Sequence, residues 1–159
     1  MPLSDYSSME REIDEVPEPI TLARGTEVKA RIISVRSGIS ESEKNPGVAY
    51  FQVFYDVPNE PLAKEFNDFF WDIADIHKLG EKARLAAMRK FKNFASAIGL
   101  DYSRPFSWED DLPGKTGWLI VGVRKSDEYG EQNTVQKYLA GGSGRPEPET
   151  PGSDEEVPF

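Results

Sequence analysis

The feature that most constrains the fold is one amphipathic helix pattern between two groups of strand patterns. Between Ile76 and Ile98, apolar side chains recur at spacings of three and four, which predicts a helix that ends at Gly99. Alternating, β-branched and aromatic segments flank it and predict strands at 26–36, 48–57, 63–71, 118–125 and 133–139. The stretch FNDFFW in the third segment also fits an irregular aromatic segment. The chain is therefore predicted to be all-β with one inserted helix.

The order of these elements along the chain indicates a particular all-β fold. Three strands, one helix and two strands follow one another in the OB-fold, a five-stranded Greek-key barrel that binds oligonucleotides on the face built by its middle strands. We expect such a barrel over residues 20–140, as a single domain. Because a fold alone does not assign a function, the function has to be argued from the side chains.

Acidic residues are concentrated at the two ends of the chain. Residues 1–19 carry six acidic side chains against one basic side chain, and residues 141–159 carry five against one. The body between them carries 17 basic and 17 acidic side chains, so the net charge of −9 does not argue against a basic face on the body. We expect residues 1–19 to be a disordered acidic segment, and residues 141–153, rich in Gly, Pro and Ser, to be a flexible linker.

The composition excludes several classes of site. The chain has no cysteine and His77 is its only histidine, which excludes disulfide frameworks, thiol nucleophiles, Ser-His-Asp triads and multi-histidine metal sites. No apolar run of about 18 residues predicts a membrane span, and the N-terminus does not resemble a signal peptide. We expect a cytoplasmic protein without cofactor or metal. Asp72, Asp75 and the acidic residues 109–111 could hold Mg²⁺ in a nuclease, but no nuclease motif surrounds them.

The last six residues form an acidic and apolar tip. They are Asp154, Glu155, Glu156, Val157, Pro158 and Phe159. An acidic tip that ends in Pro-Phe behind a flexible linker resembles the tail of bacterial single-stranded DNA-binding proteins. In that family the ring fills an apolar pocket on replication and repair partners, basic residues hold the carboxylates, and the terminal carboxylate contributes. The resemblance implies that residues 154–159 bind partner proteins.

The body resembles the phage-encoded members of this family more than the bacterial housekeeping version. One element, Leu-x-Gly-Lys before the fourth strand, is formed by Leu112, Gly114 and Lys115. A second element, Gly…Asn-x-Val-x-x-Tyr in the last hairpin, is formed by Gly130, Asn133, Val135 and Tyr138. The resemblance covers residues 20–140 and implies an OB-fold that coats single-stranded DNA and is not an enzyme.

Single-stranded DNA binding requires cations for the phosphates and aromatic rings on which the bases stack. Outward positions on the predicted strands supply candidates of both kinds. The predicted DNA-binding residues are Lys29, Arg31, Tyr50, Phe54, Trp71, Trp118, Arg124, Lys125 and Tyr138. For each aromatic residue the competing interpretation is a place in the core, and this weighs most on Trp71 and Phe69.

Strand alternation decides which face each candidate occupies. In the first strand, the apolar residues of the segment 28–32 are expected to point into the core and Lys29 to point outward. In the second strand, Gln52 marks its own face as the wetter one, which places its neighbours on that face outside. In the last strand, Val135 and Leu139 are expected to point inward and Tyr138 outward.

The predicted helix carries an excess of basic residues. Within residues 78–98, Glu81 is the only acidic residue, and the basic residues are Lys78, Lys82, Arg84, Arg89, Lys90 and Lys92. A solvated helix face is the commoner explanation of such a run. The surface could also extend the path of the DNA, or receive the acidic tip when DNA is absent.

These observations favour a protein that binds and protects single-stranded DNA without sequence specificity during phage DNA replication, recombination and repair, in the bacterial host cell. Its tip would recruit replication and recombination proteins, and a homo-oligomer is compatible with this function. The alternative is an adaptor that does not bind DNA and docks on replication enzymes through the same tip. A small metal-dependent nuclease is a third and weaker interpretation. Titration of the tryptophan fluorescence with an unstructured oligonucleotide separates the first two.

Overall fold

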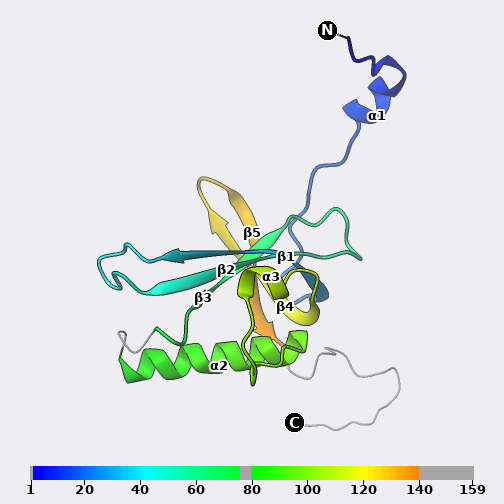
Figure 1. Ribbon diagram of the computed structural model, residues 1–159. Helices are drawn as coiled ribbons and strands as arrows, with labels where there is room; N and C mark the ends of the chain where they lie inside the picture. Colours follow the sequence, from blue (N-terminus) through cyan, green and yellow to red (C-terminus); the bar gives the residue numbers. More distant parts are fainter. Residues whose placement is uncertain (1, 76–79, 140–159) are drawn as a thin grey trace.

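The computed structural model describes residues 2–75 and 80–139 as one open sheet with a long helix along it. In chain order the elements are η1 (Ser7–Met9), α1 (Glu10–Asp14), β1 (Glu27–Ile39), β2 (Ala49–Asp56), β3 (Phe66–Trp71), α2 (Glu81–Ile98), α3 (Trp108–Asp111), β4 (Thr116–Ser126) and β5 (Gly130–Tyr138). The strands form one antiparallel sheet in the order β3-β2-β1-β4-β5, with α2 alongside (Figure 1). The prediction of a mostly β chain with one long helix between the third and fourth strands is confirmed.

The sheet is not closed into a barrel, although the sequence predicts one. β3 and β5 are its two edges, and no backbone ladder joins them within the described residues. The edges nevertheless lie close to each other, because the Tyr138 hydroxyl on β5 donates a hydrogen bond of 2.7 Å to the Asp68 carboxylate on β3. In a closed barrel, β3 and β5 would be joined by backbone hydrogen bonds. Here this side-chain hydrogen bond joins them instead.

The core lies between the inner face of the sheet and α2. On β1, Val28, Ala30 and Ile32 are buried, as the alternation predicts. The last two turns of α2 supply Phe91, Phe94, Ala95, Ala97 and Ile98. The helix ends where Gly99 adopts a left-handed conformation with φ of 73°, which a residue without Cβ adopts without strain. The predicted end of the helix is confirmed, and its predicted first residues, 76–79, lie outside the described residues.

A short helix that the sequence analysis did not predict closes one side of the core. Its first residue, Trp108, places its ring parallel to Phe51 at 4.3 Å and to Phe94 at 5.8 Å between ring centroids. The Ser107 hydroxyl caps α3 by accepting a hydrogen bond of 3.1 Å from the backbone N–H of Asp110. Trp108 is half-buried and packs against the core, where it joins the strands to α2.

The N-terminal segment adds little to this core. η1 and α1 contain no buried residue and extend away from the sheet (Figure 1). The expectation of disorder in residues 1–19 stays a prediction, because a short exposed helix does not test it. The chain joins the core at Leu22, whose backbone N–H and C=O both hydrogen-bond the buried side chain of Asn133, at 2.8 and 2.9 Å.

Candidate nucleic-acid interface

Four aromatic side chains gather on the outer face of β2 and β3. The register pairs Tyr50 with Trp71 and Gln52 with Phe69, and strand alternation adds Phe54 to the same face. We call Tyr50, Phe54, Phe69 and Trp71 the aromatic platform. The Phe69 ring lies 5.1 Å from Tyr50 and 4.8 Å from Trp71 between centroids, and its side chain is 39% exposed. Tyr50, Phe69 and Trp71 thus pack against one another, and Phe69 still offers an apolar face to the solvent.

Arg36 supplies a cation beside the aromatic platform. Its guanidinium lies 5.3 Å from the centroid of the Phe54 ring, and among the described residues no carboxylate forms an ion pair with it. Arg36 is not among the predicted DNA-binding residues. Simple alternation from Ile32 would turn residue 36 inward, but a bulge between Ile32 and Ser34 inserts one residue and turns it outward.

Gly38 makes room for the edge of the aromatic platform. It lies opposite Tyr50 in the β1–β2 register, and a Cβ at this position would lie 2.5 Å from the Tyr50 hydroxyl oxygen. The absence of a side chain therefore lets the Tyr50 ring lie over the backbone of β1. Gln52 and Asn67 add a polar edge, since the Gln52 amide donates a hydrogen bond of 3.1 Å to Asn67.

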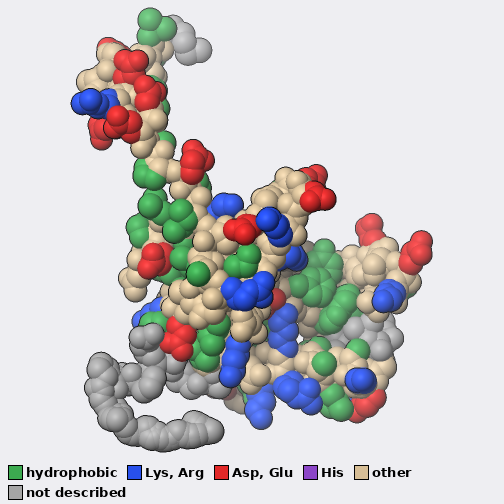
Figure 2. All heavy atoms as spheres, turned by 180° about the vertical axis from the view of Figure 1, so that it is seen from behind, with side chains coloured by type: hydrophobic (Ala, Val, Ile, Leu, Met, Phe, Trp, Pro, Cys, Tyr) green, Lys and Arg blue, Asp and Glu red, His purple; other side chains and the backbone are tan. Residues whose placement is uncertain are grey.

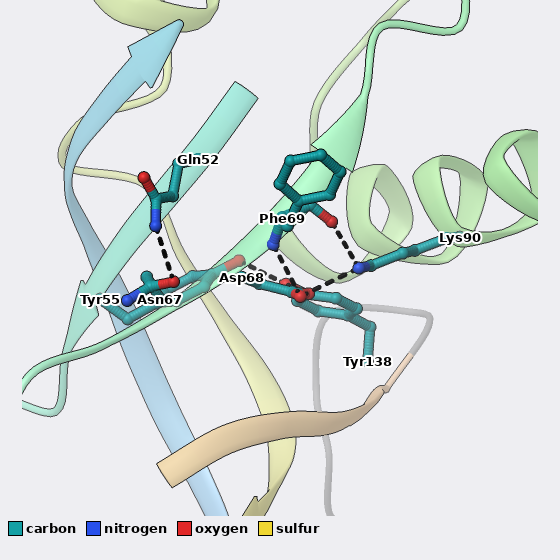
Figure 3. Close-up of polar contacts among 7 residues, drawn as sticks. All are labelled: Gln52, Tyr55, Asn67, Asp68, Phe69, Lys90 and Tyr138. Atoms are coloured by element: carbon teal, nitrogen blue, oxygen red, sulfur yellow. Dashed lines mark hydrogen bonds and ion pairs between the residues drawn. The ribbon is translucent and has the colours of Figure 1, made fainter. Parts of the chain in front are cut away.

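A polar network below the aromatic platform holds Phe69 in place (Figure 3). The Asp68 carboxylate accepts hydrogen bonds from the Phe69 backbone N–H at 2.9 Å and from the Lys90 ammonium at 2.9 Å. Lys90 also donates to the Phe69 carbonyl. The second oxygen of Asp68 accepts from the Tyr138 hydroxyl, which is 2.8 Å from the hydroxyl of Tyr55. Both backbone polar groups of Phe69 are therefore fixed by side chains from β3 and α2.

Tyr138 belongs to the core, and the prediction that it faces outward is wrong. Its side chain is buried against Phe94 and Phe70. Val121 pairs with Val135 while Ile120 pairs with Lys137, so the strand carries one extra residue, and alternation reverses after it. Burial raises the pKa of the Tyr138 hydroxyl and of the Tyr55 hydroxyl well above 10, because the charged form would lose its hydration.

The predicted residues of β1 and β4 lie beside the aromatic platform on the same outer surface. Lys29 is exposed and lies opposite Trp118, whose side chain is half-buried. Arg31 forms a two-pronged ion pair with Asp56, at 3.0 and 2.6 Å, and this carboxylate raises the pKa of the guanidinium. The charge of Arg31 is therefore already neutralised, and Lys29 is the more available cation of the two.

The remaining predicted cations lie on the β4–β5 hairpin. Arg124 is exposed, and its guanidinium is 3.4 Å from the side-chain oxygen of Gln132. Lys125 is also exposed, but alternation turns it to the opposite side of the strand from Arg124. The structure therefore brings Tyr50, Phe54 and Trp71 together, and it places the hairpin cations away from them.

The carboxylates that were considered for metal binding have local structural roles. Asp72 accepts a hydrogen bond from the backbone of Ala74, and Asp75 accepts one from the backbone of Ala49. Within residues 2–75 and 80–139, no group of three or more His, Cys, Asp or Glu side chains is arranged to hold a metal ion. In the same part of the chain, no helix is both long enough and apolar enough to span a membrane.

Two sets of residues discussed in the sequence analysis, one from the predicted helix and one from the predicted partner-binding tip, lie outside the described part of the chain. His77 and Lys78 belong to one set, and the tip residues 154–159 belong to the other. No protein-family model and no curated protein matches this sequence.

Proposed function

We propose that the chain binds single-stranded DNA without sequence specificity and that the aromatic platform is its stacking surface. The observation that carries this proposal is the group of four rings on the outer face, Phe69 exposed and the other three half-buried, with Arg36 beside it. Packing does not account for the exposure of Phe69, because the core on the other face of the strand is already filled by Phe66 and Phe70. Every base has a π-face, and stacking on an aromatic side chain contributes about 1–3 kcal/mol per base without sequence preference.

We also propose that the fold is an OB-fold. The strand order and the position of α2 between β3 and β4 support this assignment. The contact between Tyr138 and Asp68 supports it as well, since it joins the two sheet edges that meet in such a barrel. In this fold the middle strands carry the nucleic-acid site, and β2 and β3 carry the aromatic platform here.

The biological setting of the proposal comes from the sequence resemblance. It is a non-enzymatic role in phage DNA replication, recombination or repair, in the cytoplasm of a bacterial host, with partners recruited through Asp154–Phe159. A pull-down of replication proteins with the full chain and with a variant that lacks residues 154–159 tests the recruitment. We expect the shortened variant to lose the partners and to keep its affinity for DNA.

Fluorescence of the three tryptophans tests the DNA-binding proposal, because they occupy different environments. Trp71 lies in the aromatic platform, Trp108 is half-buried against the core and Trp118 lies on β4. We expect an oligothymidine to quench the fluorescence of the wild type and a duplex of equal length to have little effect. Trp71→Phe should abolish most of the quenching, while the anisotropy of a labelled oligonucleotide still reports binding. A wild type that gives neither quenching nor an anisotropy change is not a DNA-binding protein, and the adaptor interpretation then stands.

A further inference from the structure

A cleft of about 310 Å³ lies between α2 and β5, outside the aromatic platform. Arg89, Lys90 and Asn93 line it from the helix, and Gln136 and Lys137 line it from the strand. Among the described residues, Asp68 is the only acidic one in the lining. The cleft is therefore a polar and mainly basic feature at the place where the two sheet edges come together.

Two of its three cations are available to a ligand. Lys90 is not, because it pairs with Asp68 at 2.9 Å and also binds the Phe69 carbonyl. Arg89 and Lys137 are exposed, and within residues 2–75 and 80–139 no carboxylate forms an ion pair with either. Because Asp68 is already neutralised by Lys90, the cleft attracts anions through Arg89 and Lys137.

The cleft begins next to the aromatic platform. Asp68 and Lys90 line it, and the same two side chains hold the backbone of Phe69, the central ring of the platform. In the space-filling view, Lys and Arg side chains form a band over the body beside a hydrophobic area (Figure 2). A single-stranded DNA with a base stacked on Phe69 thus meets cations directly beyond the edge of β3.

We infer that single-stranded DNA leaves the aromatic platform over the edge of β3 and that the cleft binds the phosphates of this DNA through Arg89 and Lys137. This inference rests on the proposed function and specifies its path. On the other side, β1 supplies Arg36 to the aromatic platform itself, and the next cation along that strand, Arg31, is already paired with Asp56. The amides of Asn93 and Gln136 add hydrogen-bond donors for phosphate oxygens. The ligand in the cleft is therefore the backbone of a strand whose bases stack on the platform.

The test compares two double variants on two oligonucleotides. Arg89→Gln with Lys137→Gln removes the two cations of the cleft. Lys82→Gln with Lys92→Gln removes the same charge from α2 at two exposed positions that do not line the cleft and that form no ion pair within the described residues. Each is titrated with oligothymidines of four and twenty nucleotides over a range of salt concentrations, after circular dichroism has confirmed folding. The short oligonucleotide can occupy the platform alone, whereas the long one reaches the cleft as well.

We expect the cleft variant to bind the long oligonucleotide about tenfold more weakly at low salt, and its salt slope to fall by about 1.4, since each single-strand phosphate contact contributes about 0.7. Its affinity for the short oligonucleotide should equal that of the wild type. Equal losses in the two double variants, or no loss in the cleft variant when the wild type binds normally, would overturn the path and leave the proposed function standing. If the wild type binds neither oligonucleotide, the proposed function fails and the path with it.

Discussion

The two faces of the β2–β3 pair carry the same kinds of side chain in opposite situations. The inner face presents Tyr55, Phe66 and Phe70, which are all buried. The outer face presents the aromatic platform, whose central ring, Phe69, is 39% exposed. Because Phe69 and Phe70 are neighbours in the chain, residue type alone does not separate core from binding surface. An aromatic ring of this sheet is therefore assigned to the core or to the binding surface by the face it occupies and by the side chains that already fill the other face.

Truncation of an aromatic side chain on the inner face should lower the stability of the fold. The Phe70 ring lies within 6.0 Å of Phe94, Trp108 and Tyr138 between centroids, so Phe70→Ala leaves a cavity in the core. We expect the free energy of unfolding to fall by about 3–5 kcal/mol. Phe69→Ala is the matched control and should cost less than about 1 kcal/mol, because it removes a ring that is already in contact with water. Urea unfolding of both variants measures the difference, and equal losses would mean that both faces are structural.

A substitution in the polar network between the two faces should lower the free energy of unfolding by an intermediate amount. Asp68→Asn removes the charge that neutralises Lys90 and weakens the acceptor of the Tyr138 hydroxyl. We expect the free energy of unfolding to fall by about 1–3 kcal/mol, the range for a buried polar group that loses its partner. Gln52→Ala removes one surface hydrogen bond of the outer face and serves as the control. If both variants unfold at the same urea concentration, the network does not join the two faces.

Alkaline pH should destabilise the inner face through its tyrosines. Burial raises the pKa of Tyr55 and Tyr138 well above 10 in the folded state, so both keep protons that the unfolded chain releases above about pH 10. The free energy of unfolding should therefore be unaffected by these groups below pH 10 and should fall as the pH rises above it. Tyr138→Phe should make the fall less steep. Urea unfolding between pH 8 and 11 measures both slopes, and identical slopes would show that Tyr138 is not buried as described.

The smallest effect is expected at the edge of the outer face. Gly38→Ala places a methyl group where the Tyr50 ring now lies, so that the ring has to move. We expect a change in the free energy of unfolding below about 1 kcal/mol, as for most surface substitutions. The affinity for an oligothymidine should decrease by about two- to fivefold, because one of the stacking surfaces is displaced. An unchanged affinity would exclude Tyr50 from the binding surface.

Most of the sheet follows from the sequence, because alternation is a local property. It correctly turned Val28, Ala30 and Ile32 inward, and it placed Tyr50 and Phe54 together on the outer face. Alternation fails where a strand carries one extra residue, since a bulge turns every later side chain to the other face.

The two bulges account for the two main differences at the candidate site. One turns Arg36 outward beside Phe54, and the other turns Tyr138 into the core. Trp108 and α3 could not be assigned from periodicity either, because a helix of four residues has none. The cleft between α2 and β5 depends on how the two sheet edges approach each other. The sequence pattern of α2 or of β5 alone does not predict this approach.

The most direct test of the central claim is the affinity of a Phe69→Ala, Trp71→Ala double variant for oligothymidine, measured with its free energy of unfolding. Both rings lie on the outer face, so the variant should remain folded within about 1–2 kcal/mol of the wild type. Each ring lost from a stacking surface should cost about 1–3 kcal/mol of binding free energy, so the double variant should lose about 2–6 kcal/mol, which raises the dissociation constant by about 30-fold or more. A folded double variant that binds as tightly as the wild type would contradict the assignment of the aromatic platform as the DNA-binding surface.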